Sequence, residues 1–215
     1  MAQERPPTIL QIYRDSGEAR PRSGLPDGRG RRRRICAELK FPHSILAIES
    51  LRGPKEVWWL NAFDSEAEKQ QVASDYARNP ALVAALEGIA RLKEGLTEAP
   101  VNVYASYRAD LSRGAPWKVA GARFFVVSVT KGDPRAEGPV FEAPDDTRFF
   151  LRPVATRGQA DVLAAAAGPD ARVFAVRPLG HARAGMDRRG LRVLEGQPHG
   201  ASERKTVTSD GEPRT

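Results

Sequence analysis

Residues 44–63, SILAIESLRGPKEVWWLNAF, carry the pattern that decides the fold. Two runs rich in β-branched and aromatic residues, 44–50 and 56–63, flank a Gly-Pro turn, which favours two antiparallel strands joined as a hairpin. A helix is then expected from Ser65, because Glu68 stands three residues later, in the spacing of a capping box. Strand, turn, strand and helix in this order indicate an α+β domain.

Working outward from this hairpin, the same kinds of signal recur along the chain. Further strands are expected at residues 8–14, 101–108, 122–130, 147–154 and 171–178, and helices at residues 65–78, 79–95 and 161–168. The segments 8–110 and 119–178 repeat strands and helices in a similar order, which predicts two ferredoxin-like halves. We therefore expect an antiparallel sheet with helices on one face, forming an α/β barrel within the chain or across a dimer.

The segment 16–34 stands where the first helix of the first half belongs. It is rich in Arg and Gly and has no apolar periodicity, so it predicts disorder, as does the segment 179–215. One hypothesis is that both segments are frameshifted, since GC-rich coding DNA read out of frame yields Arg and Gly runs. The alternative is a natural low-complexity loop and tail.

The net charge of +7 is concentrated in two segments. Residues 16–34 carry seven Arg against two acids (+5), and residues 177–215 carry eight Lys or Arg against five acids (+3), which leaves −1 for the rest. No aromatic residues or recognition helix accompany the arginines of 31–34, which argues against a nucleic-acid-binding arm. A single Cys excludes an intrachain disulfide, and no apolar run approaches the roughly 20 residues of a membrane span. We expect a soluble cytoplasmic protein.

Three stretches resemble a known family. They are LQIYR (10–14), ESLRGPKEVWWLNAFDS (49–65) and YASYRADLSRG (104–114). In these stretches the chain is similar to uncharacterised bacterial dimeric α/β-barrel proteins of ferredoxin-like fold, related to the NIPSNAP and antibiotic-biosynthesis-monooxygenase groups. The resemblance implies a homodimer and a small-molecule pocket between sheet and helices. It also implies haem as an alternative cofactor, because some relatives bind haem through a histidine.

Five residues are candidates for such a pocket. Strand alternation places Trp59 and Asn61 on one strand face, and Glu49 lies on an otherwise apolar face of the preceding strand, where it could act as a general base. A buried amide or carboxylate needs a partner, so these positions suit a ligand, a solvent-exposed face or a subunit interface. Tyr107 could stack on an aromatic ligand, and His43 is the candidate haem or metal ligand.

These residues predict a protein that binds a small apolar or aromatic molecule, with monooxygenase-like turnover as an extension. Whether the protein is an enzyme stays open, and no cofactor is predicted apart from the haem alternative. A non-catalytic oligomeric interaction or stress module is the second reading of the same sheet face. A nucleic-acid binder acting through the basic segments is the third.

Overall fold

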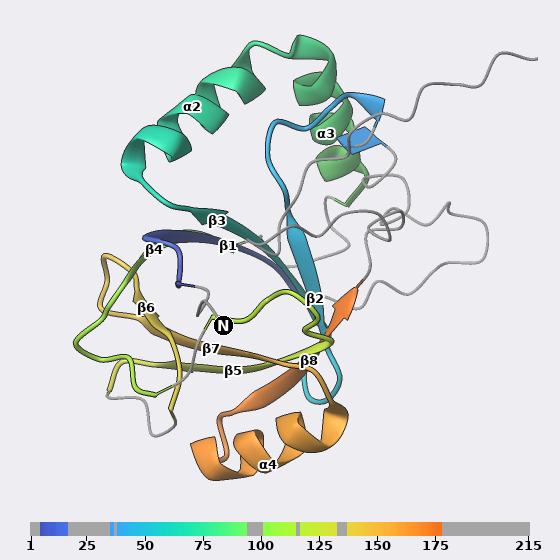
Figure 1. Ribbon diagram of the computed structural model, residues 1–215. Coiled ribbons are helices and arrows are strands. Elements are labelled where there is room, and N and C mark those ends of the chain that lie inside the picture. The colour runs from blue at the N-terminus through green and yellow to red at the C-terminus, as the bar shows by residue number, and fades with distance from the viewer. Residues whose placement is uncertain are drawn as a thin grey trace, which may run out of the picture.

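A closed antiparallel barrel of eight strands dominates the computed structural model, which describes residues 5–16, 35–36, 38–93, 101–114, 117–132 and 137–177. The strands are β1 (Ile9–Ser16), β2 (Leu46–Ser50), β3 (Glu56–Phe63), β4 (Val101–Tyr107), β5 (Phe124–Thr130), β6 (Val140–Glu142), β7 (Arg148–Val154) and β8 (Arg172–Arg177). Figure 1 shows them wrapped around one interior. The barrel closes within a single chain, in the order β1-β3-β2-β8-β5-β7-β6-β4.

The two halves of the barrel have the same strand order. Around the barrel, the first half runs β4-β1-β3-β2 and the second runs β8-β5-β7-β6, so each half places its fourth, first, third and second strands in succession. The β2–β8 and β4–β6 pairs join the halves. The antiparallel α+β fold predicted from the sequence is confirmed.

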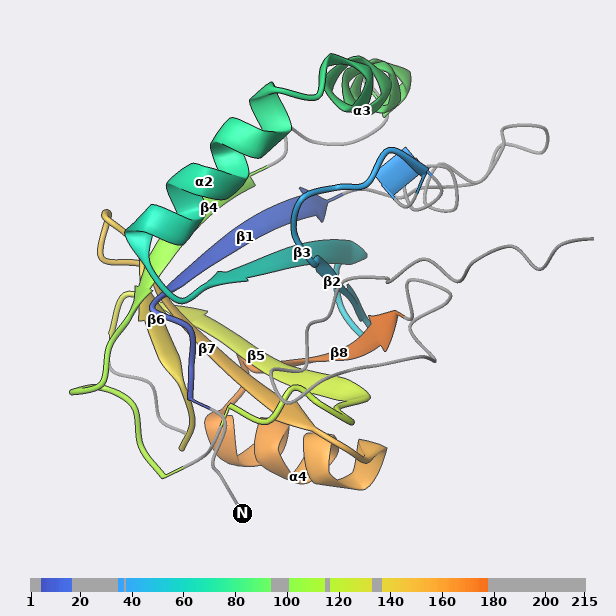
Figure 2. The ribbon, with the colours of Figure 1, turned by 45° about the horizontal axis from the view of Figure 1, so that its top comes forward.

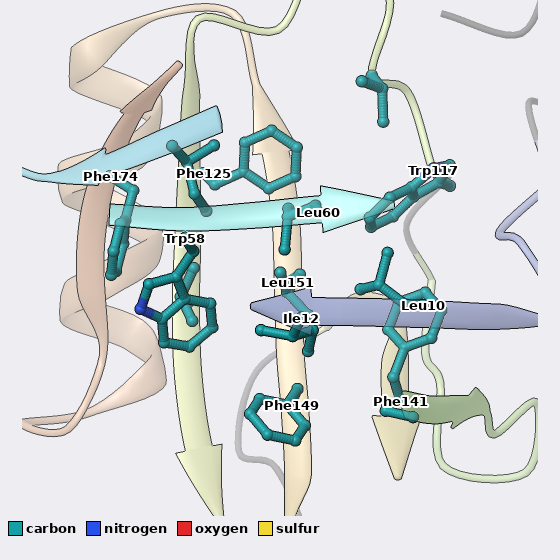
Figure 3. Close-up of a cluster of buried hydrophobic side chains, with 14 of the residues drawn as sticks. Leu10, Ile12, Trp58, Leu60, Trp117, Phe125, Phe141, Phe149, Leu151 and Phe174 are labelled. Atoms are coloured by element: carbon teal, nitrogen blue, oxygen red, sulfur yellow. The ribbon is translucent and has the colours of Figure 1, made fainter. Parts of the chain in front are cut away.

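The main hydrophobic core fills the barrel interior, where alternate side chains of every strand converge. Figure 3 shows this cluster, in which the ring of Trp58 lies 5.2 Å from that of Phe174 and 6.2 Å from that of Phe149. Its buried members are Leu10, Ile12, Ile48, Trp58, Leu60, Ala105, Trp117, Val119, Phe125, Val127, Phe141, Ala143, Phe149, Leu151 and Phe174. Functional polar groups are therefore to be sought on the outer face and at the ends of the barrel.

Three helices of the described chain lie outside the barrel, as Figure 2 shows. They are α2 (Glu66–Ala77) and α3 (Pro80–Lys93) beside the first half, and α4 (Arg157–Ala167) on the second. Ser65 caps α2 by accepting a hydrogen bond from the backbone N–H of Glu68 at 3.1 Å, as its spacing predicted. No helix among the described residues is long and apolar enough to cross a membrane.

The structure corrects several sequence-based boundaries. β6 was not expected, because three residues are too short to show a period of two. β1 continues through Ser16, and α4 begins at Arg157, four residues before the expected start, where Thr156 forms a capping box with Gln159. The frameshift and disorder hypotheses for 16–34 and 179–215 fall, apart from Ser16, outside the described residues.

Candidate functional site

Three amides and three aromatic rings lie in two adjacent rows on the outer face of β3, β1 and β4. The strand register pairs Asn61 with Gln11 and Gln11 with Tyr104, which forms the first row. Trp59, Tyr13 and Asn102 are paired in the same way and form the second row. We call these six residues the amide–aromatic patch. Directly opposed side chains on one sheet face lie about 4.5–5.5 Å apart at Cβ, so the six can act together.

Hydrogen bonds link the three amides of the patch. Asn61 Nδ2 donates to Gln11 Oε1 at 2.7 Å, and Gln11 Nε2 donates to Asn102 Oδ1 at 3.0 Å. The side-chain oxygens of Gln11 and Asn102 therefore each accept a hydrogen bond from the neighbouring amide of this ladder, and that of Asn61 does not. Asn61 Oδ1 is buried and has no hydrogen-bond partner within the part of the chain that the structure describes. Because Asn61 is only 9% exposed, this oxygen is an unfilled acceptor at the end of an ordered chain of amides.

The aromatic side of the patch extends from a buried to an exposed position. Trp59 is buried and packs with Ala47 and Val57, with Tyr13 and Ile45 against them. Tyr104 is 40% exposed, and Lys69 of α2 holds its Nζ 4.9 Å from the ring centroid. The same ammonium lies 2.7 Å from Glu66 Oε1, and this hydrogen bond lowers the pKa of Glu66. The patch therefore has a closed end at Trp59 and Asn61 and an open end at Tyr104.

Glu49 lies away from the patch. It pairs with Val57, four residues along β3 from Asn61, which corresponds to about 13 Å along the strand. Its Oε2 lies 2.5 Å from Nε of Arg177 in the neighbouring strand β8. The carboxylate that the sequence suggested as a general base therefore takes part in an ion pair between β2 and β8. The structure therefore does not bring Glu49 and Asn61 into one site.

His43 and Tyr107 also take positions outside the patch. His43 Nε2 lies 2.7 Å from the carbonyl oxygen of Ala62, and the ring stacks on Phe63 with centroids 4.9 Å apart. That nitrogen therefore donates to the backbone, and a ligand atom would have to use Nδ1. Tyr107 points into the barrel, where its ring lies 5.8 Å from that of Phe141. Within the described residues, no three His, Cys, Asp or Glu side chains gather as a metal site would need.

Sequence reasoning missed Gln11 and Asn102, which complete the amide ladder. Each is a polar residue at an outward position of a strand that was correctly predicted. The missing information was which strands neighbour β3, because β1 and β4 come together only through the strand order of the barrel. A polar residue on a half-buried strand face was the one signal available in the sequence.

A second polar cluster closes one end of the barrel. Glu56 is 6% exposed and accepts a hydrogen bond from Trp58 Nε1 at 2.7 Å, while its Oε1 lies 3.1 Å from Arg172 and 3.4 Å from Arg14. Burial raises the pKa of this carboxyl, but the hydrogen bonds from Trp58 and Arg172 and the charges of both arginines outweigh it. The net pKa is lower than that of an ordinary glutamate, so Glu56 is ionised and ties β3 to β8 and β1.

Comparisons with known proteins identify no family for the chain. No family model matches it, and no curated protein matches it. A structure from Lactobacillus acidophilus, described as a "putative monooxygenase", shares 9% identity, covers 87% of this chain and all of its own, and has a TM-score of 0.44. One from Fusobacterium nucleatum subsp. nucleatum with the same description shares 8% identity over 80% of this chain and 93% of its own, with a TM-score of 0.43.

Proposed function

We propose that the amide–aromatic patch binds a small, largely apolar or aromatic molecule that carries one hydrogen-bond donor. The observation behind this proposal is the unfilled Oδ1 of Asn61, a buried acceptor in a region where every other amide oxygen of the ladder has a partner. Leaving a buried polar group unpaired costs about 1–3 kcal/mol. A ligand hydroxyl or amine that reaches this oxygen recovers that free energy and gains orientation from it.

The surroundings of Asn61 favour a planar ligand. Trp59 lies beside it along β3, and Tyr104 stands across Gln11 at the open end, so aromatic surface borders the acceptor on two sides. Aromatic rings and a few well-placed polar groups are the usual lining of small-molecule sites. Phenols, anilines and indoles combine a flat apolar body with one donor, and they are the ligand class that this patch fits.

The amide ladder itself would hold Asn61 ready for such a ligand. Gln11 fixes the Asn61 amide from one side, and Asn102 fixes Gln11 in turn. Reversing all three amides would present N–H groups in place of the oxygen, and the site would then select ligand acceptors. Phenol and its methyl ether, anisole, have similar shapes but differ in the donor, so they separate these two arrangements.

Binding is the primary claim, and monooxygenase-like turnover is its extension. Amides and phenols are poor bases at neutral pH, so the patch residues bind and orient a ligand rather than take up its proton. A turnover reaction would therefore show as oxygen uptake that depends on the bound aromatic molecule. An oxygen electrode, with each ligand that binds, tests this extension separately from the binding itself.

We infer further that each half of the barrel is a ferredoxin-like unit. The support is the strand order, which is the same in both halves and agrees with an antiparallel sheet flanked by helices. Because the barrel closes within one chain, a homodimer would have to form through its outer surface. Light scattering coupled to size-exclusion chromatography measures whether the chain is a monomer or a dimer.

A thermal-shift screen tests the binding proposal. Phenol, aniline, indole and anisole are added to the wild-type chain and to Asn61→Leu, with Gln71→Leu as the control because Gln71 is an exposed amide on α2. We expect donors to raise the melting temperature of the wild type and of the control, by mass action, and to leave Asn61→Leu unchanged. If no compound stabilises the wild type and its stability depends on oligomer formation, the interaction-module reading replaces this proposal.

A further inference from the structure

An open groove of about 640 Å³ lies between the β2–β3 turn, α4 and the start of β8. It is separate from the amide–aromatic patch, which lies on β1, β3 and β4. Its floor is made by small apolar residues, including Ala164, Ala165 and Ala171, and its charged lining consists of Arg52, Arg172 and Asp161. The volume falls within the 300–1,000 Å³ typical of small-molecule pockets.

Hydrogen bonds hold the turn that carries Arg52 in place. Ser50 Oγ donates to the carbonyl oxygen of Pro54 at 2.7 Å and accepts from the backbone N–H of Glu56 at 3.0 Å. Arg172 Nη2 donates to the same Pro54 oxygen at 2.8 Å, and the backbone N–H of Leu51 donates to Val173 of β8 at 2.9 Å. These bonds fix the turn against β8, so Arg52 starts from a rigid backbone, which reduces the entropy lost on binding.

The acidic and basic side chains of the groove differ in how they are paired. Arg157 binds Asp161 through both carboxylate oxygens at 2.9 Å, and this pairing, helped by the charge of Arg52, lowers the pKa of Asp161. Arg52 is exposed and forms no hydrogen bond or ion pair within the described part of the chain. The carboxylate of Asp161 is therefore held by Arg157, whereas Arg52 acts on it through charge alone.

Arg172 brings a second, partly used cation to the groove. It contacts Glu56 through Nη1 at 3.1 Å and Pro54 through Nη2, which engages two of the five N–H groups of its guanidinium. Its Nε is buried and has no hydrogen-bond partner among the described residues, whereas the side chain as a whole is 25% exposed. Glu56 is shared with Arg14, so one carboxylate serves two guanidiniums at this end of the barrel.

We propose that this groove binds a small organic anion, with its carboxylate or phosphate group between Arg52 and Arg172 and its short apolar part on the alanines of α4. Charge-assisted hydrogen bonds from arginine to such oxygens are strong and directional. The carbonyl oxygens at the carboxyl end of α4 offset part of this positive charge. To bind, the ligand therefore needs an apolar part that contacts the alanines as well as an anionic group.

Isothermal titration of the full chain with butyrate, benzoate, inorganic phosphate and neutral butyramide tests the proposal. We expect saturable binding of butyrate or benzoate with a Kd below about 1 mM, weaker binding of phosphate and none of butyramide. Arg52→Ala should weaken the binding about tenfold or more, because it removes a charge-assisted contact. Arg91→Ala is the matched control, an exposed arginine on α3 that removes the same charge.

A second variant separates the apolar floor from the charge. Ala165→Leu narrows the groove without changing its charge, and it should weaken benzoate binding several-fold while leaving phosphate binding unchanged. Leucine is well tolerated in a helix, so this variant should remain folded. The proposal is overturned if none of the anions binds in a saturable way, or if Arg52→Ala and Arg91→Ala weaken binding equally.

Discussion

The two halves of the barrel share a strand order but differ in how their helices meet the outer face. In the second half, α4 buries Ala160 and Ala167 and packs with Val126, Phe150 and Val173 in an apolar cluster. In the first half, no residue of α2 is buried. The strand face beside it carries amides and aromatic rings where the second half has aliphatic side chains and phenylalanines.

This difference assigns different roles to the two outer faces. The face under α4 stabilises the fold through burial, and an unpaired polar group would be costly there. The barrel interior supplies the first half with enough core to tolerate a polar, partly open face. The amide–aromatic patch therefore lies beside a helix, α2, that buries none of its own residues, whereas α3 buries Leu82 and Ile89.

Removing a large side chain from each outer face should give the largest difference in the free energy of unfolding between the two halves. Phe150→Ala deletes a ring that is 1% exposed under α4 and should lower the free energy of unfolding by about 3–5 kcal/mol. Tyr104→Ala removes a 40% exposed ring and should cost less than about 1 kcal/mol. Urea denaturation measures both, and equal losses would contradict the comparison.

Glu56 connects the halves, and its removal should have the next largest effect. Glu56→Gln should lower the free energy of unfolding by about 1–3 kcal/mol at neutral pH, because the arginines lose their charged partner. The pKa of Glu56 is lowered in the folded protein, so its contribution is complete above the ordinary value of 4.5 and is lost as the pH falls through the lowered value. Wild type and variant should therefore converge in acid, and a difference that persists there would count against this ion cluster.

The N-terminal caps of α4 and α2 offer a closely matched comparison, in which the expected differences in stability are smaller. Thr156→Ala removes the capping box of α4 and should cost about 1 kcal/mol of global stability, because α4 unfolds with the barrel. Ser65→Ala removes the corresponding bond of α2, but α2 can fray locally, so its global cost should be below about 0.5 kcal/mol. Native-state hydrogen exchange tests this difference between the helices. In both variants the amides of α2 should exchange through local opening, and those of α4 only when the barrel unfolds.

Asn61→Leu should have a small effect on stability and the clearest effect on binding. Replacing a half-satisfied buried amide by an apolar side chain is close to neutral, and Gln11 can turn to water. We expect the free energy of unfolding to stay within about 1 kcal/mol of the wild type or to rise. A large destabilisation in urea would mean that Asn61 is a structural residue.

The hairpin at the centre of the first half could be predicted almost to the residue. β3 has the predicted bounds 56–63, and the alternation that separates Trp58 and Leu60 from Trp59 and Asn61 is the one observed. Local patterns suffice there because strand alternation, turn residues and helix caps are all encoded by near neighbours.

The candidate site could be predicted only in part, because it depends on strand order. Trp59 and Asn61 were identified from their strand face, whereas Gln11 and Asn102 come from strands about 40–50 residues away on either side. Glu49 and His43 were also candidates from the sequence, but they contact Arg177 and Ala62, away from the patch. Nothing in the sequence indicated which polar atom would lack a partner.

The side-chain amide resonances of Asn61 report most directly on the claim that the patch binds a donor-bearing aromatic molecule. A titration with phenol, followed by ¹H–¹⁵N NMR, should shift the Asn61 and Gln11 amide signals in a saturable way, because the two are hydrogen-bonded. Anisole should leave them in place. Unmoved Asn61 signals at phenol concentrations that perturb other surface residues, or equal shifts with anisole, would contradict the account.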